Sequence, residues 1–229
     1  MSRNQWVLLG GAVGVIVLGV IAYFVLFSGN GESAALPASA GTASRLAITS
    51  SDEALGNPKA PVQIVEYGAP TCPVCARFEM DNFDQIKKTY IDTGKVFYVF
   101  RVFPINGAAD GAAEGLARCA GRTSADNYFQ FIDLLFRNQK DWDPEYNPPD
   151  VHAGLLKMAR IAGIDAVADQ CMSDKANADR INVVAKDAAD RFNLSATPTL
   201  IINGVVQQPG YVPWPALKTT VDAFLAKKS

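Results

Sequence analysis

The feature that most constrains this chain is a strand–helix–strand pattern with two cysteines at its first junction. The β-branched run at residues 62–67 ends at Gly68 and Pro70 and predicts a buried strand. Residues 72–89 then follow a helical period, with apolar side chains on one stripe. Residues 95–102 predict a second buried strand. Because a helix separates the two strands, we expect them to be parallel, with a right-handed crossover.

The second half of the chain changes from helical to strand character. Residues 108–192 contain no good strand, are rich in alanine, and carry three apolar stripes at helical spacing that are typical of core-facing helix surfaces. Residues 199–202 and 205–208 flank Asn203-Gly204, and Asn-Gly between two β runs predicts a hairpin. Pro215 fits the first turn of a final helix. The pattern predicts an α/β fold interrupted by a helical segment.

The motif Cys72-Pro73-Val74-Cys75 lies where the first strand passes into the helix. A thiol at a helix N-terminus lies near unpaired backbone N–H groups, which stabilise a thiolate. Cys75 is one turn further on and can close a disulfide with Cys72, a pattern typical of thiol–disulfide exchange. Half of a zinc site is disfavoured because the other two cysteines, Cys119 and Cys171, are isolated in the sequence. An inert disulfide at a helix start stays open as an alternative.

The composition excludes several classes of protein. Apolar residues make up 49% of the chain and charged residues 19%, which excludes a disordered chain. The 21 basic and 23 acidic residues give a net charge of -2 and no basic field, so we expect no nucleic-acid partner. The single histidine, His152, excludes a histidine-rich metal site. We expect neither a metal nor a cofactor.

The N-terminal part of the chain is its most apolar segment. Between Trp6 and Phe27 there is neither a charge nor a proline, and at about 1.5 Å per residue this run matches the roughly 30 Å of a bilayer core. Arg3 precedes the run and the next basic residue is Arg45, an asymmetry that favours a cytoplasmic N-terminus. We therefore expect a single transmembrane helix within a membrane anchor at residues 1–27. A cleaved signal peptide is the alternative, although its apolar region would be shorter.

A segment rich in Ser, Gly and Ala follows the apolar run and predicts a flexible linker over residues 28–58. The folded domain then occupies residues 59–229. The predicted orientation places this domain in an oxidising space outside the cytoplasm, where cysteine pairs form disulfides.

Together the motifs resemble the DsbA family of thioredoxin-fold thiol–disulfide oxidoreductases, in its membrane-anchored, short-domain branch. The resemblance covers about residues 52–227 and is carried by Gly56-Asn57-Pro58 before the first strand, Glu66-Tyr67 within it, the Cys-Pro-Val-Cys motif, Phe100–Pro104 and Ala196–Thr199. It implies a thioredoxin fold with an all-helical insertion at about residues 107–180.

By position, the resemblance implies that Cys72 is the nucleophile that forms a mixed disulfide and that Cys75 resolves it. Pro198 matches a proline that is cis in this fold, and the backbone of Thr197 would pair with an extended substrate segment. An ordinary strand start is the alternative for this dipeptide. Glu66 matches a buried acid that moves protons for the buried cysteine, and a carboxylate in an apolar strand should have a raised pKa. A carboxylate on a solvated strand face is the alternative for Glu66.

Two positions depart from the best-known members of the family. Val74 stands where they carry histidine, so the thiolate lacks a cationic or hydrogen-bonding partner there. We predict that the pKa of Cys72 lies below that of free cysteine but is less depressed than in the strongest oxidants. Thr197 stands in place of valine, as in isomerases and reductases. Both changes leave the direction of exchange open.

A second cysteine pair lies in the predicted insertion, as it does in some relatives. We expect Cys119 and Cys171 to form a structural disulfide, because the compartment is oxidising. The long loop that it closes corresponds to a stabilisation of about 4 kcal/mol in the chain-entropy model. Two buried free thiols, packed as small apolar side chains, are the alternative.

These expectations describe an enzyme that donates its Cys72–Cys75 disulfide to folding or misoxidised secreted proteins and is reoxidised by a membrane redox partner. The resemblance implies a single-pass protein of the bacterial inner membrane, with its folded domain in the periplasm. A disulfide isomerase or reductase, and a thioredoxin-fold chaperone or assembly module, are the alternatives. The sequence leaves the oligomeric state open.

Overall fold

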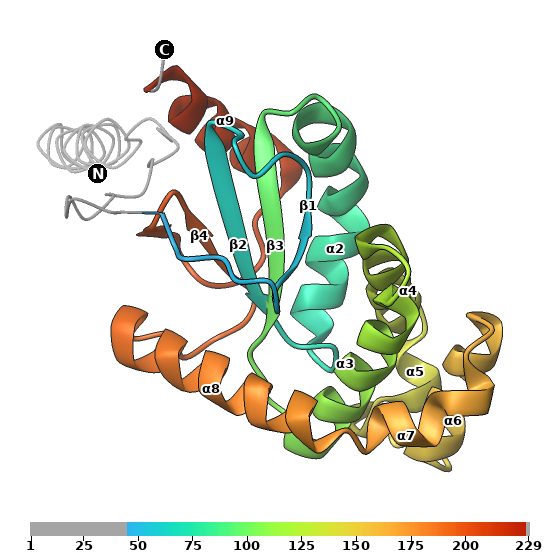
Figure 1. The fold of residues 1–229 in the computed structure, drawn as a ribbon. Helices are drawn as coiled ribbons and strands as arrows, with labels where there is room; N and C mark the ends of the chain where they lie inside the picture. Colours follow the sequence, from blue (N-terminus) through green and yellow to red (C-terminus); the bar gives the residue numbers. More distant parts are fainter. Residues whose placement is uncertain (1–44, 228–229) are drawn as a thin grey trace, which may run out of the picture. The chain divides into compact units, whose positions relative to one another are not determined.

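One mixed sheet forms the centre of the computed structural model, which describes residues 45–227 (Figure 1). Its strands are β1 (Glu53–Leu55), β2 (Val62–Gly68), β3 (Val96–Val102), β4 (Thr199–Ile202) and β5 (Val205–Val206). They lie in the order β1-β3-β2-β4-β5. The central strands β2 and β3 are parallel, as the strand–helix–strand pattern predicts, whereas β1 and β4 run antiparallel to their neighbours.

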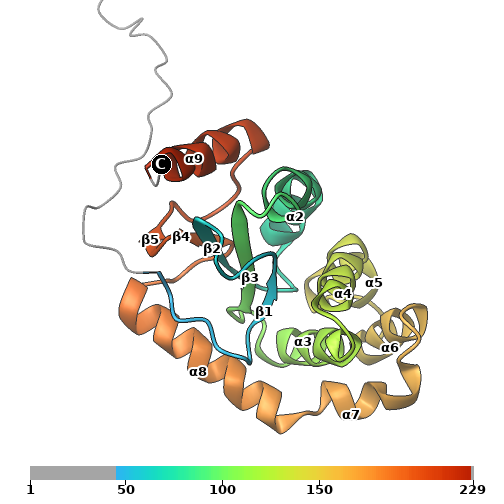
Figure 2. The ribbon, with the colours of Figure 1, turned by 45° about the horizontal axis from the view of Figure 1, so that its top comes forward.

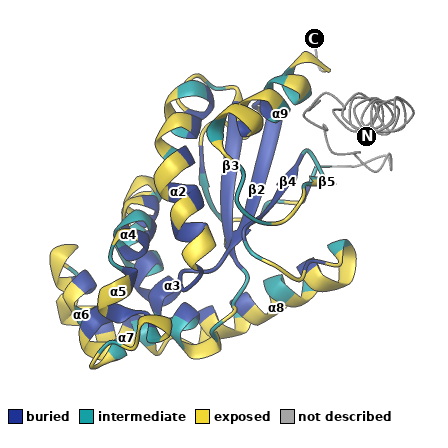
Figure 3. Ribbon diagram, turned by 180° about the vertical axis from the view of Figure 1, so that it is seen from behind, coloured by how far each residue is buried: buried dark blue, intermediate teal, exposed yellow. Residues whose placement is uncertain are grey.

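The central strands β2 and β3 are buried along their whole length (Figure 3). Their side chains alternate between the two faces of the sheet. Ile64 and Tyr98 pack into one core, and Val65 and Val99 pack into the other. The helices that cover these faces are α2 (Pro73–Ile86) and α9 (Trp214–Ala226) on the first and α8 (Lys175–Phe192) on the second. Figure 2 shows α8 on the side of the sheet opposite α2 and α9.

Between β3 and β4 the structure contains helices joined by loops and no strand, in line with the helical character predicted for residues 108–192. These helices are α3 (Gly107–Gly121), α4 (Ala125–Arg137), α5 (Gln139–Trp142), η2 (Pro144–Tyr146), α6 (Val151–Ile161), η3 (Asp165–Val167), α7 (Ala168–Met172) and α8. The predicted end of the insertion at about residue 180 lies inside α8, because one apolar stripe continues to Phe192 and holds the helix on the sheet. The helix predicted at residues 72–89 is α2 followed by a π-helical turn, η1 (Lys87–Ile91).

The predicted hairpin is formed by β4 and β5 around Asn203-Gly204. Both turn residues have positive φ, 48° at Asn203 and 82° at Gly204. A two-residue hairpin turn of type I′ requires this conformation at both positions, which is why Asn-Gly favours it. The second strand is shorter than predicted and ends at Val206.

Residues 45–58 correct the predicted boundary between linker and domain. The Leu46 N–H donates to the Gln63 side chain at 2.9 Å, and the Leu46 side chain is buried. Asp52 forms an ion pair with Arg101 of β3 at 2.8 Å, and β1 then pairs with the same strand. Residues 45–58 therefore belong to the folded domain, because they cover an edge of its sheet.

The predicted anchor at residues 1–27 and the linker up to residue 44 lie outside the described residues. Within residues 45–227, no helix combines the length and the apolar character that crossing a bilayer requires.

Candidate active site

Cys72 lies at the N-terminus of α2, directly after the turn that ends β2. It is the N-cap residue, with extended backbone angles, and its Sγ accepts a hydrogen bond from the Cys75 N–H at 3.2 Å. Pro73 occupies the first helical position, where a missing N–H costs nothing and the fixed φ favours the helix. The sequence therefore places a thiol where a helix presents unpaired N–H donors.

The surroundings of Cys72 favour its thiolate. A hydrogen bond from the Cys75 side chain has the largest effect on the pKa of Cys72, burial opposes it, and hydrogen bonds from Thr197 and from the N–H groups of Cys75 and Val74 add to it. Together they lower the pKa of Cys72 to about 6, in the direction that the sequence predicts. Val74 contributes its backbone alone, since its side chain is 42% exposed and points away from the core.

Cys75 is the buried partner of this pair. Its side chain is fully shielded from solvent, and both cysteines are thiols in this structure. Burial raises the pKa of Cys75 well above that of an ordinary thiol, and the nearby sulfur of Cys72 and carboxyl of Glu66 raise it further. The two cysteines thus differ sharply: the surroundings favour the thiolate form of Cys72 and the thiol form of Cys75.

The peptide bond between Thr197 and Pro198 is cis, and it lies against the cysteine pair. The Cys72 thiol lies 3.6 Å from the carbonyl oxygen of Thr197, which accepts its hydrogen bond. The Gly210 N–H donates to the Pro198 carbonyl at 2.8 Å, and the Thr199 hydroxyl donates to the Ala196 carbonyl at 2.7 Å. The last two bonds hold the loop before β4 in place, and the contact with Cys72 joins it to the start of α2, although the two segments are far apart in the sequence.

Glu66 is completely buried in the middle of β2, so the alternative of a solvated strand face is wrong. Its Oε2 accepts a hydrogen bond from the Tyr98 hydroxyl on β3, and its Oε1 has no hydrogen-bond partner in the described part of the chain. Burial raises the pKa of Glu66, and the hydrogen bond from Tyr98 opposes the rise. The charge of Cys72 raises the pKa of Glu66, and the charge of Glu66 raises the pKa of Cys75. This carboxyl therefore lies close to the cysteine pair.

Two residues of this site escaped the sequence analysis. Glu79 lies on α2, one turn beyond Cys75, and is only 6% exposed. Tyr98 lies between the two carboxyls, and its hydroxyl is 3.3 Å from Glu79 Oε1. The sequence does carry a signal for Glu79, because Cys75, Phe78, Glu79 and Ile86 fall on one helical stripe.

The helical insertion holds the turn that precedes α2. Asp110 on α3 is buried and accepts a hydrogen bond from the Thr71 N–H at 2.9 Å. Gln139 on α5 donates to the carbonyl oxygens of Pro70 at 2.8 Å and Cys72 at 3.1 Å. Sequence patterns give no indication of these contacts, since each joins segments that only the fold brings together.

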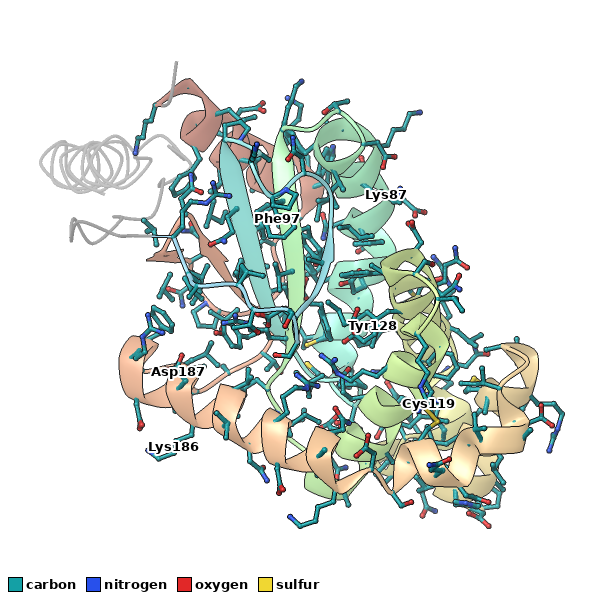
Figure 4. The ribbon with its side chains drawn as sticks, in the orientation of Figure 1. Lys87, Phe97, Cys119, Tyr128, Lys186 and Asp187 are labelled. Carbon is teal, nitrogen blue, oxygen red and sulfur yellow. A yellow bond between two sulfur atoms is a disulfide. The ribbon has the colours of Figure 1, made fainter. Side chains whose placement is uncertain are left out.

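The predicted disulfide between Cys119 and Cys171 is present and joins α3 to α7 (Figure 4). The two residues are 52 positions apart in sequence, and their Cα atoms are 6.1 Å apart. The carbonyl of Cys171 packs directly on Gly115, where a Cβ atom would lie 2.1 Å from its oxygen. The disulfide therefore holds two helices in close backbone contact.

The described residues contain no group of three or more His, Cys, Asp or Glu side chains arranged to hold a metal ion. His152 is exposed and pairs with Asp169 at 2.7 Å on the surface of the insertion.

Comparison with known proteins gives consistent relatives over the described domain. The thioredoxin family model named Thioredoxin_4 matches residues 49–223. A Rickettsia prowazekii protein named "Putative protein-disulfide oxidoreductase" is 37% identical over 163 residues, which are 69% of this chain and 56% of the relative. The chain thus spans little more than half of that relative. Disulfide bond formation protein D of Bacillus subtilis is 27% identical over 179 residues, 76% of this chain and 77% of the relative.

Among solved structures, alpha-DsbA1 of Wolbachia pipientis is similar in both fold and sequence. It superposes with a TM-score of 0.72 at 30% identity, and the match covers 80% of this chain and 95% of that chain.

Proposed function

The chain belongs to the DsbA family of thioredoxin-fold proteins, and from that premise we propose that it is a protein-disulfide oxidoreductase acting through Cys72 and Cys75. The observation that carries the proposal is the position of the Cys72 sulfur, at a helix N-terminus, beside Cys75 and against the Thr197 carbonyl. A shielded thiol with a low pKa and a neighbouring resolving thiol is suited to disulfide exchange.

The proposed reaction begins from the Cys72–Cys75 disulfide. A substrate thiolate attacks Cys72 Sγ and forms a mixed disulfide, while the bond to Cys75 breaks and Cys75 leaves as a thiolate that takes up a proton. A second substrate thiolate then attacks the substrate sulfur of the mixed disulfide and releases Cys72 as a thiolate. The substrate gains a disulfide and loses two electrons, and the enzyme gains both electrons as a dithiol.

Five further residues complete the proposed site. Glu66 supplies the proton for Cys75, because it is a buried carboxyl whose charge acts on the cysteine pair. The backbone of Thr197 and the ring of Pro198 form the surface against which an extended substrate segment docks by β-augmentation. Pro73 and Val74 complete the motif: Pro73 favours the helix start, and Val74 is exposed between the two cysteines.

A proposal of exchange chemistry requires that Cys72 be essential. We expect Cys72→Ser to abolish the oxidation of a reduced substrate protein. In Cys75→Ser, the Cys72 thiolate should attack the disulfide of an oxidised substrate protein and displace one substrate thiolate, and the resulting mixed disulfide should accumulate and be visible on a non-reducing gel. If Cys72→Ser retained full function in its host, the alternative of a chaperone or assembly module would be preferred.

The direction of exchange is tested by the reduction potential of the Cys72–Cys75 pair. A reduction potential close to that of DsbA, about -120 mV, favours an oxidase. A reduction potential close to that of thioredoxin, about -270 mV, favours a reductase. The isomerase or reductase alternative has specific support, because Val74 offers no side-chain partner to the thiolate and Thr197 precedes the cis-proline.

We also propose that residues 1–27 anchor the protein in the bacterial inner membrane, with the folded domain in the periplasm. Folding or misoxidised secreted proteins would then be its substrates, and a membrane redox partner would reoxidise it. Retention of the full chain in membranes after carbonate extraction, with protease access from the periplasmic side, supports this location. Release by carbonate contradicts it.

A further inference from the structure

The loop between β5 and α9, residues 207–213, is fastened to the side of α2. Asn82 of α2 is fully buried, and its amide Nδ2 donates to the carbonyl oxygens of Val212 at 3.1 Å and Phe78 at 3.0 Å. A buried amide is costly unless it is hydrogen-bonded, so an apolar side chain would otherwise be favoured at this position. The polar residue therefore holds the loop to the helix.

The same loop is held to α2 at the surface through Tyr211. The Tyr211 hydroxyl donates to Asp81 Oδ2 at 2.8 Å. The guanidinium carbon of Arg77 lies 4.1 Å from the centre of the Tyr211 ring, and Arg77 Nε lies 3.6 Å from the same Asp81 oxygen. The three side chains thus contact one another pairwise, which fixes the ring more firmly than any one exposed contact would.

Gly210 joins this held segment to the loop that precedes β4. Its N–H donates to the carbonyl oxygen of Pro198 at 2.8 Å. The φ angle of Gly210 is 106°, a backbone conformation that residues with a Cβ atom rarely adopt. Pro209 and Pro213 flank the segment, and the ring of each fixes its own φ. Residues 210–212, which we call the strut, therefore form a short and preorganised connection between α2 and Pro198.

Thr197 and Pro198 present consecutive carbonyl groups that are bound from two sides. The Thr197 carbonyl accepts from the Cys72 thiol at 3.6 Å, and the Pro198 carbonyl accepts from the strut. A disulfide sulfur has no hydrogen to donate, so the first bond is absent when Cys72 is oxidised. The bond from the strut involves no sulfur and is available in both redox states.

We propose that the strut positions the Thr197–Pro198 backbone for a docking substrate segment, a role that rests on the proposed exchange reaction. A substrate thiolate meets the protein in its disulfide form, in which Cys72 cannot hold Thr197 by a hydrogen bond. The strut keeps this backbone edge beside the disulfide at that stage. Gly210 and Asn82 are thus positioning residues, which act on the reaction through that backbone.

This role separates large from small reaction partners. A small thiol such as dithiothreitol needs only access to Cys72 Sγ, whereas an extended peptide also pairs with the Thr197 backbone. A displaced backbone edge weakens peptide binding and leaves attack by the small thiol unchanged. The hydrogen bond from Cys75, which has the largest effect on the pKa of Cys72, lies within α2 and does not involve the strut. Loss of the strut should therefore appear in the concentration dependence of the peptide reaction.

The central variant is Gly210→Ala in the full chain. A Cβ atom at this position meets no atom within 4 Å, so the substitution changes the backbone preference and crowds nothing. Gly94→Ala is the matched control, because Gly94 also has a positive φ, 71°, and open space around it. Gly94 precedes β3, at the end of the sheet opposite Cys72.

Asn82→Ala and Arg77→Ala loosen the other end of the strut. The control for the first is Asn177→Ala, which removes a buried amide that donates to a backbone carbonyl at 3.3 Å. The control for the second is Arg191→Ala, because the Arg191 guanidinium lies 5.0 Å from the centre of a phenylalanine ring and pairs with an aspartate at 3.1 Å. Both control residues lie on α8, on the other side of the sheet.

The assay compares two reductants of the oxidised protein in a single turnover. The first is an extended peptide with two cysteines, supplied in excess at increasing concentration, and the second is dithiothreitol. Acid quench and thiol alkylation give the amount of oxidised protein that remains at each time. Urea denaturation of each variant verifies that it is folded.

The strut predicts that Gly210→Ala raises the peptide concentration at half-maximal rate about tenfold, and that Asn82→Ala and Arg77→Ala change it in the same direction. The rate constant with dithiothreitol should stay within about twofold of that of the unmodified chain for every variant. The three controls should match the unmodified chain with both reductants. If Asn82→Ala is too unstable to purify, Gly210→Ala decides.

Two results would overturn the proposal. An equal loss of rate with the peptide and with dithiothreitol indicates a general disturbance of Cys72. An unchanged peptide reaction in folded Gly210→Ala shows that the strut does not position the docking edge.

Failure of the strut is distinguishable from failure of the proposed function. If Cys72→Ser is inactive while Gly210→Ala reacts normally with the peptide, the exchange reaction stands and the positioning role is wrong. If Cys72→Ser still oxidises the peptide, the proposed function itself is wrong.

Discussion

The low pKa of Cys72 has a direct consequence for the redox equilibrium of the pair. In the reduced protein the surroundings of Cys72 lower its pKa to about 6, whereas burial keeps Cys75 protonated. Formation of the dithiol therefore takes up two protons below pH 6 and one proton above it. The stabilisation of the dithiol form is fully present above the pKa of an ordinary thiol and is lost as the pH falls through about 6.

The size of the effect follows from the distance between the pH and this pKa. At pH 7, one unit above about 6, the thiolate stabilises the reduced form by about 1.4 kcal/mol relative to an ordinary thiol. For a two-electron couple this is about 30 mV, in the oxidising direction. The potential should fall by about 59 mV per pH unit below pH 6 and by about 30 mV per unit above it.

The assay is equilibration with glutathione buffers of known potential from pH 5 to 8, followed by quench, alkylation with a mass tag and quantification of both forms. The same series in Glu66→Gln removes the contribution of that carboxyl to the slope. A single slope of about 59 mV per unit through the whole range would show that Cys72 is an ordinary thiol, and the reasoning from its N–H donors would fail.

Three further predictions concern the parts of the fold that support the site. Replacing Cys119 and Cys171 by alanine should lower the free energy of unfolding, measured by urea denaturation, by about 4 kcal/mol, because the disulfide joins residues 52 positions apart. A loss below about 1 kcal/mol would contradict the loop-entropy argument. Gln139→Ala leaves carbonyls at the start of α2 without their donor and should cost about 1–3 kcal/mol, whereas Gln130→Ala on the exposed face of α4 should cost almost nothing. In a graded dithiothreitol titration with alkylation, the pair at the start of α2 should be reduced before the Cys119–Cys171 disulfide, and simultaneous reduction would contradict this order.

The elements that the sequence predicts correctly are those with a long local signal. β2 and β3 are continuous β-branched and aromatic runs because both faces of these strands are buried, and such runs are recognisable without knowledge of their neighbours. β1 was missed because Glu53–Leu55 is too short to show alternation. Its position depends on the pairing with β3 and on the ion pair between Asp52 and Arg101, both of which are long-range contacts.

The residues of the candidate site also differ in whether a local sequence signal or a long-range contact reveals them. Cys72 and Cys75 are recognisable because the chemistry depends on adjacent residues of one motif. Glu79 resembles any carboxylate on an amphipathic helix until the packing of α2 on β3 brings it to Tyr98. The isomer of the Thr197–Pro198 bond is equally hidden, because the cis and trans forms differ by only about 0.5–1 kcal/mol before the fold selects one.

The two cysteine pairs show how backbone position sets the chemistry of one residue type. Cys72 lies at a helix N-terminus, where N–H groups stabilise a thiolate, so the reduced pair is stabilised and Cys72 is a good leaving group from the mixed disulfide. Cys119 and Cys171 lie in the last turns of α3 and α7, where carbonyl groups and the negative end of the helix dipole disfavour a thiolate. A disulfide whose thiolates are poorly stabilised is a poor electron acceptor, since its reduced form gains nothing from the protein. The fold thus makes one pair reactive and the other structural, without any difference in the residues themselves.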